Sequence, residues 1–292
     1  MNTFWTVVLI TFIAGVGGTG IGGLLGVLFH RNSEKIVSLL LSFAGGVMLA
    51  VVCLDLLTEA IGQNADSIGH IFLVIGMVIA GYGIVYLLNA IIDKKTNPQV
   101  KHIDDEHPKT ADQLSELIHS DHYEEHKREM ESGNSKISKG ELFVAGLVMA
   151  IAIALHNLPE GMVIGATYAK SDIVANFFLT DGFLIAVIIG LHNIPEGMSV
   201  SVPLVSGGMG KIKAAVITAL TGLPTVFGAM LGYSLGTLSP ISLAISLSLA
   251  SGAMLYVVFG ELLPESILMW RSKAPAFAML IGLIVGVIIL YI

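Results

Sequence analysis

Eight stretches of the chain are almost entirely apolar, and each is long enough to cross a bilayer as a helix. Such a helix needs about 20 apolar residues. The stretches are Phe4–Phe29, Ile36–Ala60, Ile71–Ile92, Leu142–Tyr168, Gly182–Val205, Ile212–Leu238, Ile241–Pro264 and Ala274–Ile292. The first lacks the basic start of a cleaved signal peptide and is too long for one, so we expect it to be a span. The pattern predicts an all-α integral membrane protein with eight transmembrane helices.

The composition excludes a soluble protein. Of the 292 residues, 54% are hydrophobic and 13% are charged, whereas a soluble domain is about 25% charged. The net charge is −7, without a basic domain, so nucleic acid is not expected as a partner. Cys53 is the single cysteine, which excludes an intramolecular disulfide and a thiolate metal cluster.

The basic residues predict the orientation of the spans. Loops that face the cytoplasm carry an excess of Lys and Arg. If the N-terminus lies outside, 14 of the 15 basic residues fall in inner loops, and only Lys170 lies outside. Eight spans return the C-terminus to the same side. We therefore expect both termini to be extracytoplasmic, in a multi-pass protein of the cell (cytoplasmic) membrane whose main partner is the lipid bilayer.

One long polar segment interrupts the apolar pattern. Residues 1–92 and 141–292 should form one membrane domain, of helices 1–3 and 4–8, joined by a cytoplasmic loop at 93–140. This loop has few large apolar residues and cannot bury a core. It holds five of the nine histidines, and His119, His122 and His126 would share one face of a helix. It is either a solvated linker or a low-affinity metal buffer or sensor, and these roles are compatible.

Ionisable side chains inside a membrane span are costly and usually functional. The predicted spans and their ends contain eight such groups, and no Lys or Arg is among them. The groups are Asp55, Glu59, His156, Glu160, His192, Glu196, Glu261 and Glu265. Six carboxylates without a basic partner require protonation or a bound cation.

The fourth and fifth spans repeat one phrase. Residues 155–162 read LHNLPEGM and residues 191–198 read LHNIPEGM. His156 and Glu160 are four residues apart, as are His192 and Glu196, so each pair lies on one helix face. Two imidazoles and two carboxylates suit Zn²⁺, and also Fe²⁺, Mn²⁺, Co²⁺ or Cd²⁺. A single pair could instead hold a helix kink by hydrogen bonding, but two copies near mid-membrane favour a metal site.

Other residues of the repeat add polar atoms to the predicted site. Asn157 and Asn193 could supply amide oxygens or orient the ligands. Pro159 and Pro195 each free a backbone carbonyl four residues earlier, which a membrane tolerates only beside a cavity, an ion or a partner.

Further residues mark a route to and from this site. Met48 shares a helix face with Asp55 and Glu59, which lie nearer the outside, so the three suggest an entry path. From spacing alone, core packing, the commoner role of methionine, is favoured for Met48 over a role as a ligand. Glu261 and Glu265 near the inner end of the seventh span suggest an exit vestibule, or simply an interfacial helix end.

The paired HNxPEG phrases resemble the ZIP family of divalent-metal transporters, and the resemblance covers the whole chain. It implies a binuclear-type centre between the fourth and fifth helices, with His156, Glu160 and Glu196 as primary ligands. His192 matches a position where the ligand type varies. The resemblance also implies that Asn157 and Asn193 belong to a second site that the two glutamates bridge. Met48 matches a methionine near the first site, and Asp55 matches an entrance position.

The resemblance further implies import toward the cytosol, sliding or rocking of one helix group against another, and a homodimer in some members. Two positions depart from the family pattern. Thr225 stands where some members have a carboxylate, which weakens the case for a full second site. Gly260 stands where some members have a histidine beside the exit glutamate.

We therefore predict a membrane transporter of divalent metal ions, chiefly Zn²⁺, that needs no cofactor. No GxxxxGK[ST] phrase for ATP hydrolysis occurs. The alternative is an intramembrane zinc-dependent hydrolase, but Asn157 and Asn193 stand where an HExxH helix has its catalytic glutamate. A third possibility is a metal sensor, which would need no transport path.

Overall fold

The computed structural model describes residues 3–28, 34–96, 139–170, 180–270 and 272–291, and their regular secondary structure is entirely helical. Eight helical segments in these ranges are long and apolar enough to cross a membrane, which confirms the predicted eight spans. The segments are Thr3–Leu28, Lys35–Gly62, Ile68–Ile91, Met149–Ala169, Asp181–Ser206, Lys211–Leu238, Pro240–Leu262 and Ala274–Tyr291.

Several spans are built from more than one helical element. The first contains α1 (Thr3–Phe12), the π-helix η1 (Ile13–Gly17) and α2 (Gly18–Leu28). The second contains α3 (Glu34–Ala50), the π-helix η2 (Val51–Leu56) and α4 (Leu57–Gly62), and the third is α5 (Ile68–Thr96). The fourth is α8 (Lys139–Lys170) and the fifth is α9 (Asp181–Ser206). The others are α10 (Lys211–Leu220) with α11 (Leu223–Leu238), α12 (Pro240–Tyr256) with the π-helix η4 (Val257–Leu262) and α13 (Leu263–Met269), and α14 (Ala274–Tyr291).

The sixth span, predicted as one helix, is interrupted between α10 and α11. Pro224 lies in the first turn of α11, where its missing N–H breaks the hydrogen-bond ladder of the preceding turn. The next helix, α12, also has a proline in its first turn and begins with a capping box. The hydroxyls of Ser239 and Ser242 each accept a hydrogen bond from the other residue's backbone N–H.

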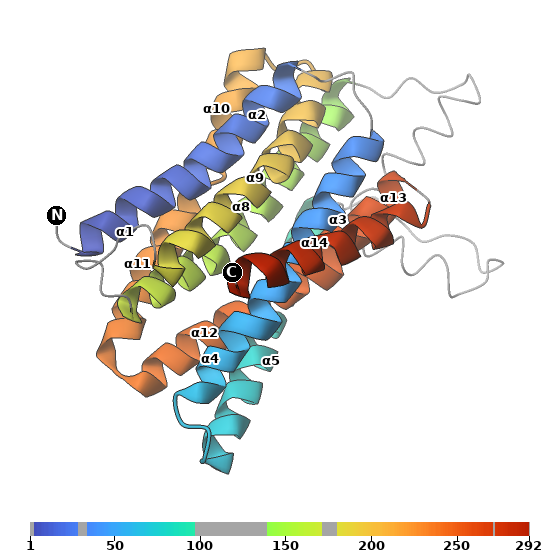
Figure 1. The fold of residues 1–292 in the computed structure, drawn as a ribbon. Helices are drawn as coiled ribbons and strands as arrows, with labels where there is room; N and C mark the ends of the chain where they lie inside the picture. Colours follow the sequence, from blue (N-terminus) through green and yellow to red (C-terminus); the bar gives the residue numbers. More distant parts are fainter. Residues whose placement is uncertain (1–2, 29–33, 97–138, 171–179, 271, 292) are drawn as a thin grey trace.

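The spans form two groups. In the first, α8 packs against α11 and α9, while α9 packs against α2 and α10 packs against α2. In the second, α3 packs against α14 and α13, while α5 packs against α12. Figure 1 shows α1, α2, α8, α9, α10 and α11 on one side and α3, α4, α5, α13 and α14 on the other. Contacts of α12 with α8 and of α3 with α9 join the groups.

Glycine allows the close helix crossings of the first group. A Cβ on Gly161 of α8 would overlap the carbonyl oxygen of Thr225 on α11, and one on Gly197 of α9 would overlap the carbonyl oxygen of Thr19 on α2. Gly18, Gly22 and Gly26 make the matching approach from α2 to α9. These three glycines, each four residues after the last, therefore form a packing surface on the first span.

The polar segment between the third and fourth spans begins and ends inside described helices. Helix α5 continues to Thr96 and α8 starts at Lys139. His119, His122 and His126 lie outside the described residues, so the role of the loop stays a prediction. The orientation of the termini across the membrane also stays a prediction.

Candidate metal centre

The two copies of the repeated phrase face each other across the contact of α8 and α9. His156 lies near Glu196, and His192 lies near Glu160. As the residue number rises on α8, that of its partner on α9 falls, which means that the helices run antiparallel. Each histidine therefore meets the glutamate of the other copy, a crosswise pairing that the spacing within one helix does not show.

Three side chains converge at this crossing. His192 Nε2 lies 2.8 Å from Glu160 Oε1 and 3.2 Å from Glu196 Oε1. One ligand atom from each lies within 4.8 Å of the other two, and all three residues are at least 96% buried. Such a cluster of one imidazole nitrogen and two carboxylate oxygens matches the donor types of divalent zinc sites. The predicted residues are thus brought together, and their role as ligands stays a prediction.

His156 adjoins this cluster and is oriented by a carboxylate on another span. Its Nδ1 lies 2.9 Å from Glu261 Oε2, and its Nε2 lies 3.5 Å from Glu196 Oε1. A carboxylate at this distance favours the proton on Nδ1, which would leave the Nε2 lone pair toward the centre, the tautomer that a metal ligand needs. Glu261 of η4 therefore contacts a histidine of the candidate centre, and its role as an exit residue stays a prediction.

Asn89 on α5 was not predicted as a site residue, because its amide is not ionisable. Its Nδ2 donates to Glu261 Oε1 at 2.9 Å and lies 3.0 Å from the hydroxyl of Tyr256. A narrow cavity is lined by Val85, Asn89, Ala152, Leu155, His156 and Glu261. The signal available in the sequence was an amide within the apolar run LLNAII, since such a group needs a hydrogen-bond partner when it is buried.

The two asparagines of the repeat are completely buried. Asn157 Nδ2 donates to the carbonyl oxygen of Thr221 at 2.8 Å, beside the break between α10 and α11. Asn157 Oδ1 and the hydroxyl of Thr225 are buried without a hydrogen-bond partner among the described residues. One end of the Asn193 amide lies 3.4 Å from the carbonyl oxygen of Ala14, and the other faces Glu160 and Glu196.

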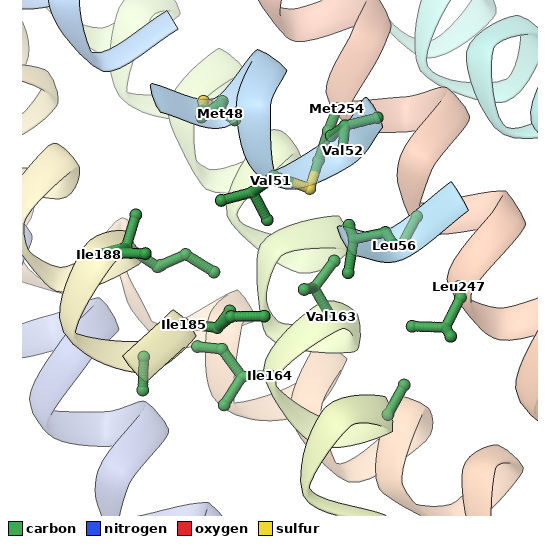
Figure 2. Close-up of a cluster of buried hydrophobic side chains, with 14 of the residues drawn as sticks. Met48, Val51, Val52, Leu56, Val163, Ile164, Ile185, Ile188, Leu247 and Met254 are labelled. Atoms are coloured by element: carbon green, nitrogen blue, oxygen red, sulfur yellow. The ribbon is translucent and has the colours of Figure 1, made fainter. Parts of the chain in front are cut away.

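The remaining predicted residues lie around this centre. Met48 is 1% exposed and belongs to a large apolar cluster, where it lies near Val51 in Figure 2, so its role as a ligand stays a prediction. Asp55 is half-buried on the π-helix η2. Glu59 is half-buried on α4 and accepts a hydrogen bond from the Gln63 amide. The side chain of Glu265 lies outside the described residues.

A cluster of buried apolar side chains, shown in Figure 2, includes residues that adjoin the centre along α8 and α9. Val163 and Ile164 follow Glu160 on α8, while Ile185 and Ile188 precede His192 on antiparallel α9. Residues of η2 and α12 complete the cluster: Val51, Val52, Leu56, Leu247 and Met254. The cavity beside His156 and Glu261 lies elsewhere, next to α5 and η4. In this conformation, apolar side chains therefore pack on one side of the centre, whereas a cavity adjoins the other side.

Comparison with known proteins agrees with this architecture. The family model for the ZIP zinc transporter matches residues 3–292. The zinc transporter ZupT of Clostridium perfringens is 31% identical, over 99% of this chain and 95% of the relative. The zinc transporter ZupT of Campylobacter jejuni is 33% identical, over 97% of this chain and 93% of the relative.

A third relative, the zinc transporter ZupT of Akkermansia muciniphila, is 31% identical over 88% of this chain and 86% of its own length. The family model and these relatives agree, because the relatives align with this chain over most of their own lengths. The chain belongs to the ZIP zinc transporter family.

Proposed function

We propose that the protein carries divalent metal ions, chiefly Zn²⁺, through the cell membrane into the cytosol. The observation that carries this proposal is the buried group of Glu160, His192 and Glu196 at the crossing of two spans. The membrane-crossing parts of those spans, Met149–Ala169 and Asp181–Ser206, contain no Lys or Arg that could neutralise the carboxylates. A divalent cation is the partner that such a set of oxygens and nitrogen lacks.

The family is one of transporters and not of enzymes, which sets aside the intramembrane hydrolase. Iron, manganese and cadmium remain alternative ions, because the same donor types bind them. We keep the homodimer and the absence of a required cofactor as predictions. Of the ligand set, we propose His156, Glu160, His192 and Glu196 as the residues that hold the ion during passage.

The proposed path follows from the two unequal sides of the centre. Asp55 and Glu59 would receive the ion on the side of α4, where apolar side chains of η2, α8 and α9 close the way to the centre. Glu261 and Asn89 would receive it on the other side, beside the cavity. His156 belongs to the first helix group and Glu261 to the second, so a sliding or rocking of the groups would change their contact.

The direct test is zinc flux into liposomes that contain the purified protein and a zinc-responsive dye. We expect a dye response that saturates with zinc concentration and that empty liposomes lack. A purified protein that binds zinc tightly and moves none would contradict the proposal and would favour the sensor.

Acid should inhibit transport. Carboxylate and imidazole groups bind a metal ion only when they are deprotonated, so protons compete with zinc for the centre. We expect the initial rate of uptake to fall between about pH 7.5 and about pH 5. As a control, the same liposomes with a zinc ionophore in place of the protein show how the dye itself responds to zinc at each pH. An unchanged protein-dependent rate over this range would contradict proton competition at the centre.

Changing Asn89 should slow transport without abolishing it. The Asn89→Ala variant loses the donor to Glu261, which then orients His156 less well. Loss of such an outer partner commonly costs about 10- to 100-fold in metal affinity or activity. We expect a fall toward the lower end of that range, since the central glutamates are unchanged. The exposed Asn64 provides the matched control as Asn64→Ala, for which the rate should equal that of the native protein. Equal rates for both variants would contradict a role of Asn89 at the centre.

A further inference from the structure

The Asn193 side chain lies directly beside the metal centre. It is completely buried on α9, directly after His192. One end of its amide group lies 3.4 Å from the carbonyl oxygen of Ala14. The other end lies 3.2 Å from Glu160 Oε2 and 3.3 Å from Glu196 Oε2. The amide is therefore within hydrogen-bond distance of both central carboxylates.

The orientation of this amide decides what the centre can hold. An amide oxygen between two carboxylate oxygens would need a cation among the three. An amide nitrogen there donates to both carboxylates, and hydrogen bonds to an ionised group are about twice as strong as neutral ones. These two bonds outweigh the long bond to the carbonyl oxygen of Ala14 that the opposite orientation keeps. We therefore place the nitrogen toward the glutamates.

The two oxygens of each carboxylate then have separate roles. The Oε1 atoms of Glu160 and Glu196 both face His192 Nε2, at 2.8 and 3.2 Å. The Oε2 atoms of the same residues both face the Asn193 amide. The amide thus holds the two carboxylates so that one oxygen of each converges with the imidazole nitrogen.

The charge of the centre agrees with a single ion. Two ionised glutamates neutralise one divalent cation, whereas a second ion would leave two positive charges in a completely buried site. The nearby buried side chains of Asn157 and Thr225 are neutral. Glu261 is half-buried and already bonded to Asn89 and His156.

We propose that this centre holds one divalent ion and that the Asn193 amide takes the place of a second. Asn193 is then a positioning residue that acts through Glu160 and Glu196. This inference rests on the proposed function, since it concerns the ion that the centre carries. It departs from the binuclear centre that the family resemblance implies.

The test counts zinc ions bound per chain by the purified full-length protein, by elemental analysis after equilibrium dialysis. The Glu160→Gln/Glu196→Gln double variant supplies the reference, because the histidine-rich 93–140 segment is the same in both proteins and its zinc cancels. We expect the native protein to bind one ion more than the double variant. A difference of two would overturn this inference and leave the proposed function standing, whereas a difference of zero would contradict the proposed function itself.

Two variants of Asn193 examine the amide directly. Asn193→Asp adds a negative charge and removes the donors, yet two ions would still leave one uncompensated positive charge, so we expect the same count as in the native protein. A second central ion in this variant would contradict the limit set by charge. Asn193→Ala removes the donors without adding charge, so we expect one central ion with an affinity about 10- to 100-fold lower. Unchanged zinc affinity in Asn193→Ala would overturn the positioning role, even if the aspartate variant failed to fold.

Discussion

The Glu196→Gln protein should lose zinc transport almost completely. Among the carboxylates that the structure describes, Glu196 presents the oxygen that faces both histidines, with Oε1 at 3.2 Å from His192 and 3.5 Å from His156. Glutamine keeps the shape of the side chain but removes one of the two buried negative charges that neutralise the ion. Loss of an outer partner already costs about 10- to 100-fold, so loss of this central charge should lower the initial rate by more than about 100-fold. Zinc uptake by liposomes at equal protein content measures this.

The matched control is Asp66→Asn, the same acid-to-amide change in the exposed turn between α4 and α5. Its rate should equal that of the native protein, because Asp66 lies outside the three-residue central group. Zinc uptake within a factor of about three of native by Glu196→Gln, a difference of less than about 1 kcal/mol in barrier height, would show that the ion passes elsewhere.

The spans and the repeated motif were predictable because they depend on local sequence. A bilayer fixes the length of an apolar helix, so all eight spans could be found from apolar stretches. The spacing of His156 and Glu160 within one helix likewise fixes their common face. The absence of basic residues in the same spans then indicated a cation.

The pairing of the site was less predictable, because it depends on how distant helices pack. The sequence shows pairs within one helix, such as His192 with Glu196, whereas the structure also brings each histidine to the glutamate of the other helix. The contact of Glu261 with Asn89 joins residues 172 positions apart. No local pattern predicts which face of α5 meets η4, and Asn89 escaped notice because an amide carries no charge.

The π-helices were also missed, and two of them bear predicted path residues. Asp55 lies on η2 and Glu261 lies on η4. A π-helical turn inserts one residue into the helix and changes the faces that later side chains occupy, and such turns are frequent at functional sites. The prediction that Met48, Asp55 and Glu59 share one face assumed an unbroken α-helix. The π-helix between Met48 and Glu59 therefore changes the angular relation on which that prediction depended.

The Gly161→Ala protein should be less stable and inactive in transport. Helix α8 approaches α11 so closely at Gly161 that an added Cβ would overlap the backbone carbonyl oxygen of Thr225. A backbone atom cannot move aside by rotating, so the two helices must separate. Overpacking of this kind typically costs about 1–3 kcal/mol. Because Glu160 precedes Gly161 directly, the same displacement would move a central carboxylate away from His192.

The matched control is Gly83→Ala on α5, where nothing lies within 4 Å of the added Cβ. Alanine there should leave transport unchanged and slightly raise stability, since glycine costs about 0.5–1 kcal/mol relative to alanine inside a helix. Thermal unfolding of both variants in the same detergent gives the comparison. We expect a midpoint several degrees below native for Gly161→Ala and at or above native for Gly83→Ala. If the two midpoints coincide, α8 and α11 do not cross as closely as described, and the position of Glu160 must be fixed by other contacts.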